Sequence, residues 1–92
     1  MIDLVHARSL LEEEESLVLK KHEEALVGVA ARCGQPLLAV YDRDLLVHSF
    51  IKNEGMSHEG AEEWVGVNIE GGWHGDKTPL ILEQIETHLP LD

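Results

Sequence analysis

The segment from Gly55 to Pro79 constrains the fold of this chain more than any other, and it reads GMSHEGAEEWVGVNIEGGWHGDKTP. It holds six of the eight glycines and both tryptophans. Glycine takes backbone conformations in which a side chain would clash, so we expect the chain to turn at several places here. The segment holds no complete nucleophile and base pair, metal-ligand cluster or phosphate-binding loop. The sequence therefore predicts a particular shape and no cofactor.

Length and composition predict one soluble domain, residues 1–92. Apolar residues make up 43% of the chain, and no apolar run approaches the roughly 18 residues of a membrane span. Asp3 stands where an export signal carries basic charge. Cys33 is the single cysteine, so no internal disulfide can form. These features predict a cytoplasmic protein.

The acidic balance is the strongest compositional signal. Eighteen carboxylates against seven lysines and arginines give a formal charge of −11. This charge repels nucleic acid and anionic membranes and attracts basic protein surfaces. From Val47 onward the only lysines or arginines are Lys52 and Lys77. We therefore expect a basic protein partner, with no direct binding of nucleic acid or membrane; acidity that only keeps a small protein soluble is the simpler interpretation.

The first 33 residues predict one long helix, from about Asp3 to Arg32. Asp3 can cap it, and Gly28 is the only glycine or proline between residues 4 and 32. Apolar residues recur every seven positions, at Leu4, Leu11, Val18 and Ala25. The heptad is imperfect, which favours a helix packed on the core; a homodimer through this helix is the alternative.

Two further elements are expected after a stop at Gly34 and Pro36. The apolar run from Leu37 to Tyr41 predicts a short strand. Asp42 then predicts the cap of a second helix over about residues 43–54.

The glycine-rich segment predicts a third helix. Gly55 ends the second helix, and Ser57 can cap the third, which runs to about Glu70 before Gly71 and Gly72 break it. Helical spacing puts apolar side chains and Asn68 on one face: Ala61, Trp64, Val65, Asn68 and Ile69. The other face is acidic and carries Glu59, Glu62, Glu63 and Glu70.

Together these elements predict a mainly helical α+β fold. It has a long N-terminal helix (1–33), a core (34–82) with two central helices and a short two-stranded β element, and a short C-terminal helix and tail (83–92). The second strand is expected at Leu80 to Leu82, paired with Leu37 to Tyr41. The last helix is expected over Glu83 to Leu89, or to start directly at Thr78-Pro79.

An ordered set of residues gives the chain a resemblance to a known family. The string VYDRD precedes an apolar helix and GMS, and after them come Ala61, Glu63, Trp64, Asn68, Gly72, Trp73, Gly75, Thr78 and Pro79. This GMS…AxEWxxxNxxxGWxGxxTP pattern, within about Gly34 to Leu82, resembles a family of small uncharacterised acidic proteins encoded by phages and prophages. The resemblance implies a phage-type accessory protein in the cytoplasm of a bacterial host, and it brings no established activity.

Each prominent side chain also has a structural interpretation. Tryptophans in a small protein usually fill the core, and an asparagine at a helix end usually satisfies backbone groups, as expected of Asn68. Trp73 has a functional alternative, in which it stays exposed on the glycine loop and anchors a partner. None of the six histidines stands three or four positions from another, so no metal site is predicted.

The leading hypothesis is a binding protein rather than an enzyme. An acidic accessory protein of this kind docks on a basic, nucleic-acid-handling host or defence protein, such as a CRISPR effector or a restriction enzyme, and its carboxylates take the place of phosphates. Carboxylates one helical turn apart, with Cβ atoms about 5 to 6 Å from each other, suit several lysines or arginines. The expected contact residues are Glu59, Glu62, Glu63, Glu70, Trp73 and Asp76, with a second patch at Glu12 and Glu13 within Glu12–Glu15.

Two alternatives belong to other classes of protein. One is a small enzyme or ligand-binding domain with its site at the Gly71–Gly75 loop, formed by Asn68, Trp73, His74 and Asp76. The other is a homo-oligomeric structural or regulatory protein assembled through the long helix.

Overall fold

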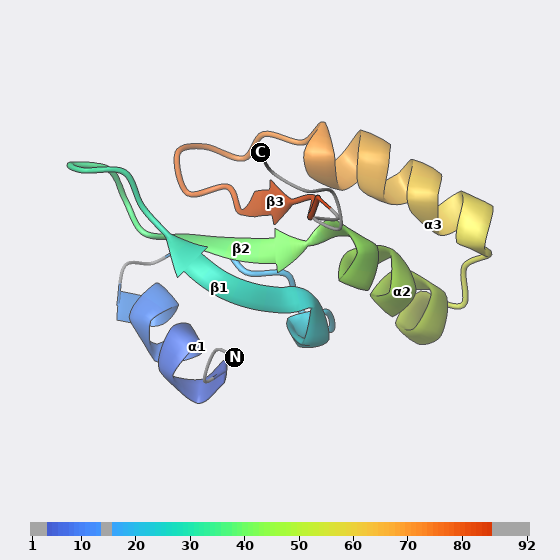
Figure 1. The fold of residues 1–92 in the computed structure, drawn as a ribbon, viewed down its shortest axis with the longest axis horizontal. Coiled ribbons are helices and arrows are strands. Elements are labelled where there is room, and N and C mark those ends of the chain that lie inside the picture. Colours follow the sequence, from blue (N-terminus) through green and yellow to red (C-terminus); the bar gives the residue numbers. More distant parts are fainter. Residues whose placement is uncertain (1–3, 14–15, 86–92) are drawn as a thin grey trace, which may run out of the picture.

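A computed structural model describes residues 4–13 and 16–85 of the chain, and it forms a small mixed sheet with helices at its two edges (Figure 1). In chain order the elements are α1 (Leu4–Glu13), η1 (Glu23–Ala25), β1 (Leu26–Ala30), β2 (Leu38–Asp42), α2 (Arg43–Glu54), α3 (His58–Trp64), η2 (Val65–Glu70) and β3 (Leu80–Leu82). The short η1 is a 3₁₀ turn, whereas η2 continues α3 in π-helical form.

The sheet has three strands in the order β1-β2-β3. A turn that contains Gly34, at φ 79°, joins β1 to the antiparallel β2. The connection from β2 to the parallel β3 runs through α2, α3 and η2. Figure 1 shows α1 on the β1 side of the sheet and α3 on the β3 side.

One hydrophobic core joins these elements. Tyr41 from β2 and Leu46 from α2 are among its largest fully buried side chains. Every other element except β3 also contributes to the buried cluster, which comprises Leu11, Ala25, Leu26, Ala39, Tyr41, Leu46, Val47, Phe50, Ala61 and Val65. Tyr41 Oη accepts a hydrogen bond of 2.8 Å from the Leu19 amide, which fixes the irregular chain before η1 against the sheet.

The prediction of a long N-terminal helix is wrong. Helix α1 ends at Glu13, and residues 26–30 form β1 instead. Lys21, at φ 71°, takes a left-handed conformation that interrupts a helix. Val27 and Val29 are β-branched and suit a strand that pairs with β2. The structure therefore lacks the continuous helix of residues 3–32 on which the expected homodimer depends.

The same error explains the wrong fold class. The strand expected at Leu37 to Tyr41 is present as β2, and β3 pairs with it as predicted. Because residues 26–30 add a third strand, the two-stranded element becomes a three-stranded mixed sheet. The protein is therefore less helical than the sequence analysis predicted.

The local signals around the two central helices are confirmed. The Asp42 carboxylate accepts a hydrogen bond of 3.0 Å from the Leu45 amide and caps α2, which ends at Gly55 in a left-handed conformation. Ser57 caps α3 through the Gly60 amide. The packing of α3 is confirmed for Ala61 and Val65, whereas Trp64 and Asn68 are exposed.

The C-terminal helix expected over Glu83 to Leu89 falls largely outside the described residues. Residues 83–85 follow β3 without helical structure. Gln84 donates a hydrogen bond of 2.5 Å to the buried Asp42 carboxylate, so Asp42 joins the start of α2 to the chain after β3.

Replacing Asp42 by alanine is expected to lower the free energy of unfolding by about 1 to 2 kcal/mol, because the Leu45 amide loses its cap. Asp44→Ala is the matched control, since Asp44 is an exposed carboxylate in the first turn of the same helix and contributes about 0.3 to 1 kcal/mol through the helix dipole. Urea denaturation of both variants measures the difference. Equal losses would contradict the capping role of Asp42.

Candidate functional site

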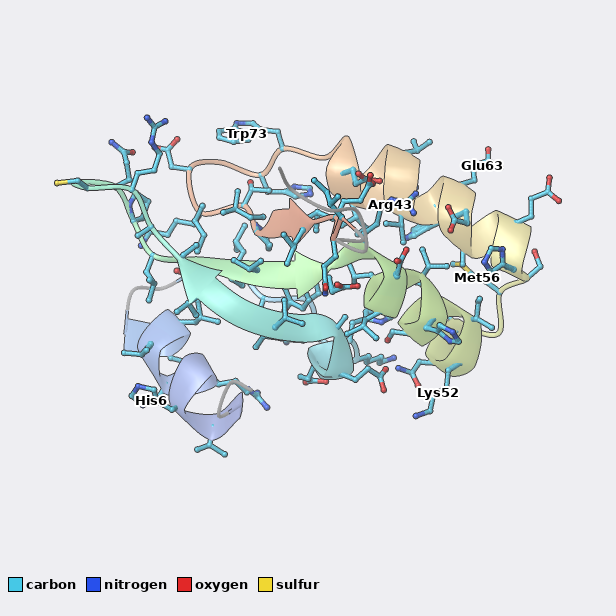
Figure 2. The ribbon with its side chains drawn as sticks, in the orientation of Figure 1. His6, Arg43, Lys52, Met56, Glu63 and Trp73 are labelled. Atoms are coloured by element: carbon cyan, nitrogen blue, oxygen red, sulfur yellow. The ribbon has the colours of Figure 1, made fainter. Side chains whose placement is uncertain are left out.

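The outer face of α3 carries two carboxylates that point away from the core. Glu59 and Glu63 are exposed and lie one helical turn apart, and Val67 continues the same row at 64% exposure. Neither glutamate forms an ion pair with another residue that the structure describes. We call Glu59 and Glu63 the α3 acidic pair. Figure 2 shows Glu63 on the same side of the molecule as Trp73, with His6 and Lys52 on the opposite side.

The other two glutamates of the predicted acidic stripe contact Arg43 at the start of α2. Arg43 Nε lies 2.7 Å from Glu70 Oε1, and Nη1 lies 3.1 Å from Glu62 Oε2. Glu83 adds a third carboxylate at 3.8 Å. The Arg43 side chain is only 17% exposed, and its hydrogen bonds to Glu70 and Glu62 raise the pKa of its guanidinium. These four residues form the Arg43 cluster.

The structure thus divides the predicted stripe into two pairs. Glu62 and Glu70 hold α3 and η2 against α2, and their charge is partly compensated by Arg43. Glu59 and Glu63 have no such compensation among the described residues and face solvent. The surface available to a cationic partner is therefore centred on the α3 acidic pair.

The second predicted patch lies on α1, on the other side of the sheet (Figure 1). Glu12 is exposed. Glu13 ends α1, and Glu14 and Glu15 lie outside the described residues. This patch is therefore separate from the α3 acidic pair.

Trp73 stands on a tight loop that follows η2. A Cβ on Gly72 would meet the Asn68 carbonyl oxygen at 2.6 Å, so glycine is required for the loop to pass this close to the helix end. The Thr78 hydroxyl accepts from the His74 amide and donates to the Gly75 carbonyl, both at 2.7 Å. This framework holds Trp73 with 72% of its surface exposed.

A groove of about 700 Å³ lies between this loop and the β1–β2 turn. Trp73 and Asp76 line it from the loop, and Arg32 and Gln35 line it from the turn. The remaining lining residues are mostly apolar, and they are Ala30, Ala31, Pro36, Leu38, Ile69, Glu70, Gly72, Thr78, Pro79, Leu80 and Ile81. We call it the Trp73 groove. Asn68 and His74, expected to share a site with Trp73 and Asp76, are exposed and do not line it.

A buried polar network joins the chain before β1 to α2. His22 Nδ1 lies 2.7 Å from Ser49 Oγ, and the Ser49 hydroxyl donates to Glu24 Oε1 at 2.6 Å. Asn53 donates to the same carboxylate oxygen at 2.7 Å. The His22 ring also stacks on Phe50 with 4.1 Å between centroids. The hydrogen bonds from Ser49 and Asn53 lower the pKa of Glu24.

The proton of the Ser49 hydroxyl distinguishes this network from a catalytic triad. In a triad the imidazole lies between the hydroxyl and the carboxylate and accepts the hydroxyl proton. His22 also lies between a hydroxyl and a carboxylate, since its Nε2 is 3.4 Å from Glu54 Oε2. The Ser49 hydroxyl, however, donates its proton to Glu24 and therefore accepts from His22 Nδ1. Ser49 is 1% exposed and His22 is 5% exposed. The arrangement joins two parts of the fold.

Sequence analysis missed the residues that position this site. Arg43 gave no signal beyond its place after a helix cap, and its carboxylate partners are 19 or more positions away. Arg32 and Gln35 were assigned to a helix end and the stop after it, so their place opposite Trp73 was not expected.

No group of three histidine, cysteine or acidic side chains suited to a metal ion occurs among the described residues.

Comparison with known proteins found no relative of this chain. No family model, curated protein or solved structure matches the chain. The resemblance to a phage family therefore stays a prediction. Within the described part of the chain, no helix is long and apolar enough to cross a membrane.

The lowered pKa of Glu24 predicts an acid-dependent loss of stability. Its ionised form is favoured in the folded state, so its contribution is present above its ordinary pKa of 4.5 and is lost as the pH falls through the lowered value. Glu24→Gln is expected to be less stable than the parent protein near neutral pH, and the difference in the free energy of unfolding is expected to shrink as the pH falls below 4.5. Urea denaturation across this range measures it. Glu59→Gln controls for the removal of one charge, and a difference that does not change with pH would contradict the role of Glu24.

Proposed function

We propose that this protein is a phage-type accessory protein that acts in the bacterial cytoplasm by binding a basic protein. Its target is a host or defence protein that handles nucleic acid, such as a CRISPR effector or a restriction enzyme, and binding inhibits that target. The single observation that carries this proposal is the α3 acidic pair, exposed and without an ion pair among the described residues. The protein itself is proposed to bind neither nucleic acid nor membrane.

The geometry of the pair supports competition with phosphates. Two carboxylates one helical turn apart present negative charge with Cβ atoms about 5 to 6 Å from each other. Lysines and arginines that otherwise grip a nucleic-acid backbone can bind carboxylates with charge-assisted hydrogen bonds. Because α3 is a regular helix joined to α2 by the Arg43 cluster, the backbone that carries the two carboxylates needs little ordering on binding.

Apolar side chains on the same side of the molecule add apolar contact area to the charged surface. Val67 adjoins the acidic pair, and the exposed Trp73 lies on the same side in Figure 2. Stable interfaces generally bury aromatic anchors inside a polar rim. A net charge of −11 also accelerates encounter with a cationic partner. The surface therefore combines attraction at long range with anchors at contact.

The Trp73 groove favours a second candidate, a ligand-binding site at the Gly71–Gly75 loop. Its volume is in the range of small-molecule sites, roughly 300 to 1,000 Å³. Such a site would use Trp73 and Asp76 with the β1–β2 turn. A small molecule retained through purification and detected by native mass spectrometry would favour this candidate.

Reversing the α3 acidic pair is the direct test of the proposed inhibitor. The double variant Glu59→Lys, Glu63→Lys is expected to bind the target roughly tenfold to a hundredfold more weakly and to release its nucleic-acid-binding activity, because like charges then face each other. Purified nucleic-acid-binding effectors are screened for loss of nucleic-acid binding in the presence of the protein, at low and high ionic strength. Inhibition that weakens with salt is expected.

The matched control changes the same net charge on the other side of the molecule. Glu12→Lys with Glu13→Lys alters α1 and leaves α3 intact, so inhibition is expected to persist. Circular dichroism checks that both variants fold. If the α3 variant still inhibits and the α1 variant does not, the interface lies on α1. If both variants inhibit as the parent protein does, the acidic surface is not the binding surface.

A further inference from the structure

We infer that the Trp73 groove receives an extended, arginine-bearing segment of the basic partner. This inference rests on the proposed function for the identity of that partner, and it assigns a second contact surface separate from the α3 acidic pair. The observation behind it is the juxtaposition of an exposed indole, two carboxylates and two hydrogen-bond donors around an apolar floor.

The shape of the groove suits an extended chain. Its floor is apolar and includes Leu38 from β2 with Leu80 and Ile81 from β3. Strand β3 has β2 as its neighbour in the sheet that the structure describes, which makes it an edge strand there. Extended peptides commonly bind beside edge strands and place alternate side chains in adjoining pockets. The volume of about 700 Å³ accommodates a few residues of such a peptide.

The charges around the groove favour a guanidinium on the loop side. Asp76 and Glu70 line this side together with Trp73. Glu70 Oε1 accepts from Arg43, whereas Asp76 is exposed. A guanidinium can stack on an indole face while it donates hydrogen bonds to a neighbouring carboxylate. A phosphate or carboxylate on this side of the groove would instead meet two like charges in a protein of net charge −11.

The opposite wall carries the groups that a peptide backbone needs. Arg32 and Gln35 line the groove from the β1–β2 turn, and both can donate hydrogen bonds to carbonyl oxygens. Arg32 repels a cation on its own side of the groove, which restricts the guanidinium to the Trp73 and Asp76 side. The groove therefore defines an orientation for an arginine peptide as well as a charge preference.

Hydrogen bonds and a close backbone approach restrict the loop that carries Trp73. Thr78 closes the turn through His74 and Gly75, and the close approach of Gly72 to the Asn68 carbonyl fixes where the loop leaves the helix. A tryptophan on such a backbone has only two side-chain torsions left to order when a ligand stacks on it. Pro79, also at the groove, further restricts the backbone.

Nuclear magnetic resonance titration of the full chain with a capped peptide tests this inference. The probe contains two arginines separated by glycine, and its comparator carries citrulline, a neutral isostere, in their place. The arginine peptide is expected to shift the Trp73 indole signal and the backbone amides of Gly72 and Asp76 in a saturable manner. The citrulline peptide is expected to bind at least about fivefold more weakly.

Two groove variants and one control make the assignment specific. Trp73→Ala is expected to weaken binding of the arginine peptide by roughly fivefold to thirtyfold, and Asp76→Asn by roughly fivefold. Trp64→Ala removes the other tryptophan, which lies on α3 and does not line the groove. The affinity of this variant for the arginine peptide is expected to stay unchanged. Equal binding of the two peptides, or peptide-induced shifts confined to residues outside the groove, would overturn the inference.

The same experiment separates this inference from the proposed function. The Glu59→Lys, Glu63→Lys variant leaves every groove-lining residue in place. At high ionic strength, where the change in net charge is screened, the arginine peptide is expected to shift the same groove signals in this variant as in the parent protein. If the peptide fails to bind while that variant still loses inhibition, the groove assignment is wrong and the inhibitor proposal stands. If the peptide binds in the groove but no effector is inhibited, the inhibitor proposal fails instead.

Discussion

The Arg43 cluster is the interaction on which the arrangement of this protein depends. A single guanidinium at the start of α2 binds Glu62 of α3 and Glu70 of η2, with Glu83 after β3 nearby. Because Asp42 beside it caps α2 and accepts from Gln84, two adjacent residues connect three segments that are distant in sequence. Loss of Arg43 would leave Glu62 and Glu70 close together without their shared cation, so this guanidinium joins α3 and η2 to the start of α2.

The same cluster determines which acids remain available for binding. Glu62 and Glu70 share one guanidinium, so their negative charge is partly compensated, whereas Glu59 and Glu63 have no cation beside them among the described residues. The acidic composition therefore serves two purposes on one helix: one pair of glutamates holds α3 in place, and the neighbouring pair faces solvent. Total charge alone does not distinguish these purposes, since all four glutamates count equally toward it.

Local signals in the sequence predicted the central helices well, and long-range pairing explains the rest. Asp42, Gly55 and Ser57 act on backbone groups within a few residues, so their effect is visible in a short window. Strand β1 depends on pairing with β2 across the Gly34 turn. A search for helical periodicity within residues 3–32 cannot detect this contact. Leu11 and Ala25 are both buried as the heptad pattern suggests, but from two different elements of one core.

The candidate site was predictable only in part for the same reason. Glu59, Glu63 and the glycine loop could be placed from helical spacing and turn residues, because these relations are local. The Trp73 groove needs Arg32 and Gln35 from a turn nearly forty positions earlier, and that turn exists only because residues 26–30 form a strand. Glu70 belongs both to the Arg43 cluster and to the lining of the groove, so the groove lies next to the contact that joins α3 and η2 to α2. For the partner that we propose, an arginine segment bound in the groove would set the register at which its other cations meet Glu59 and Glu63.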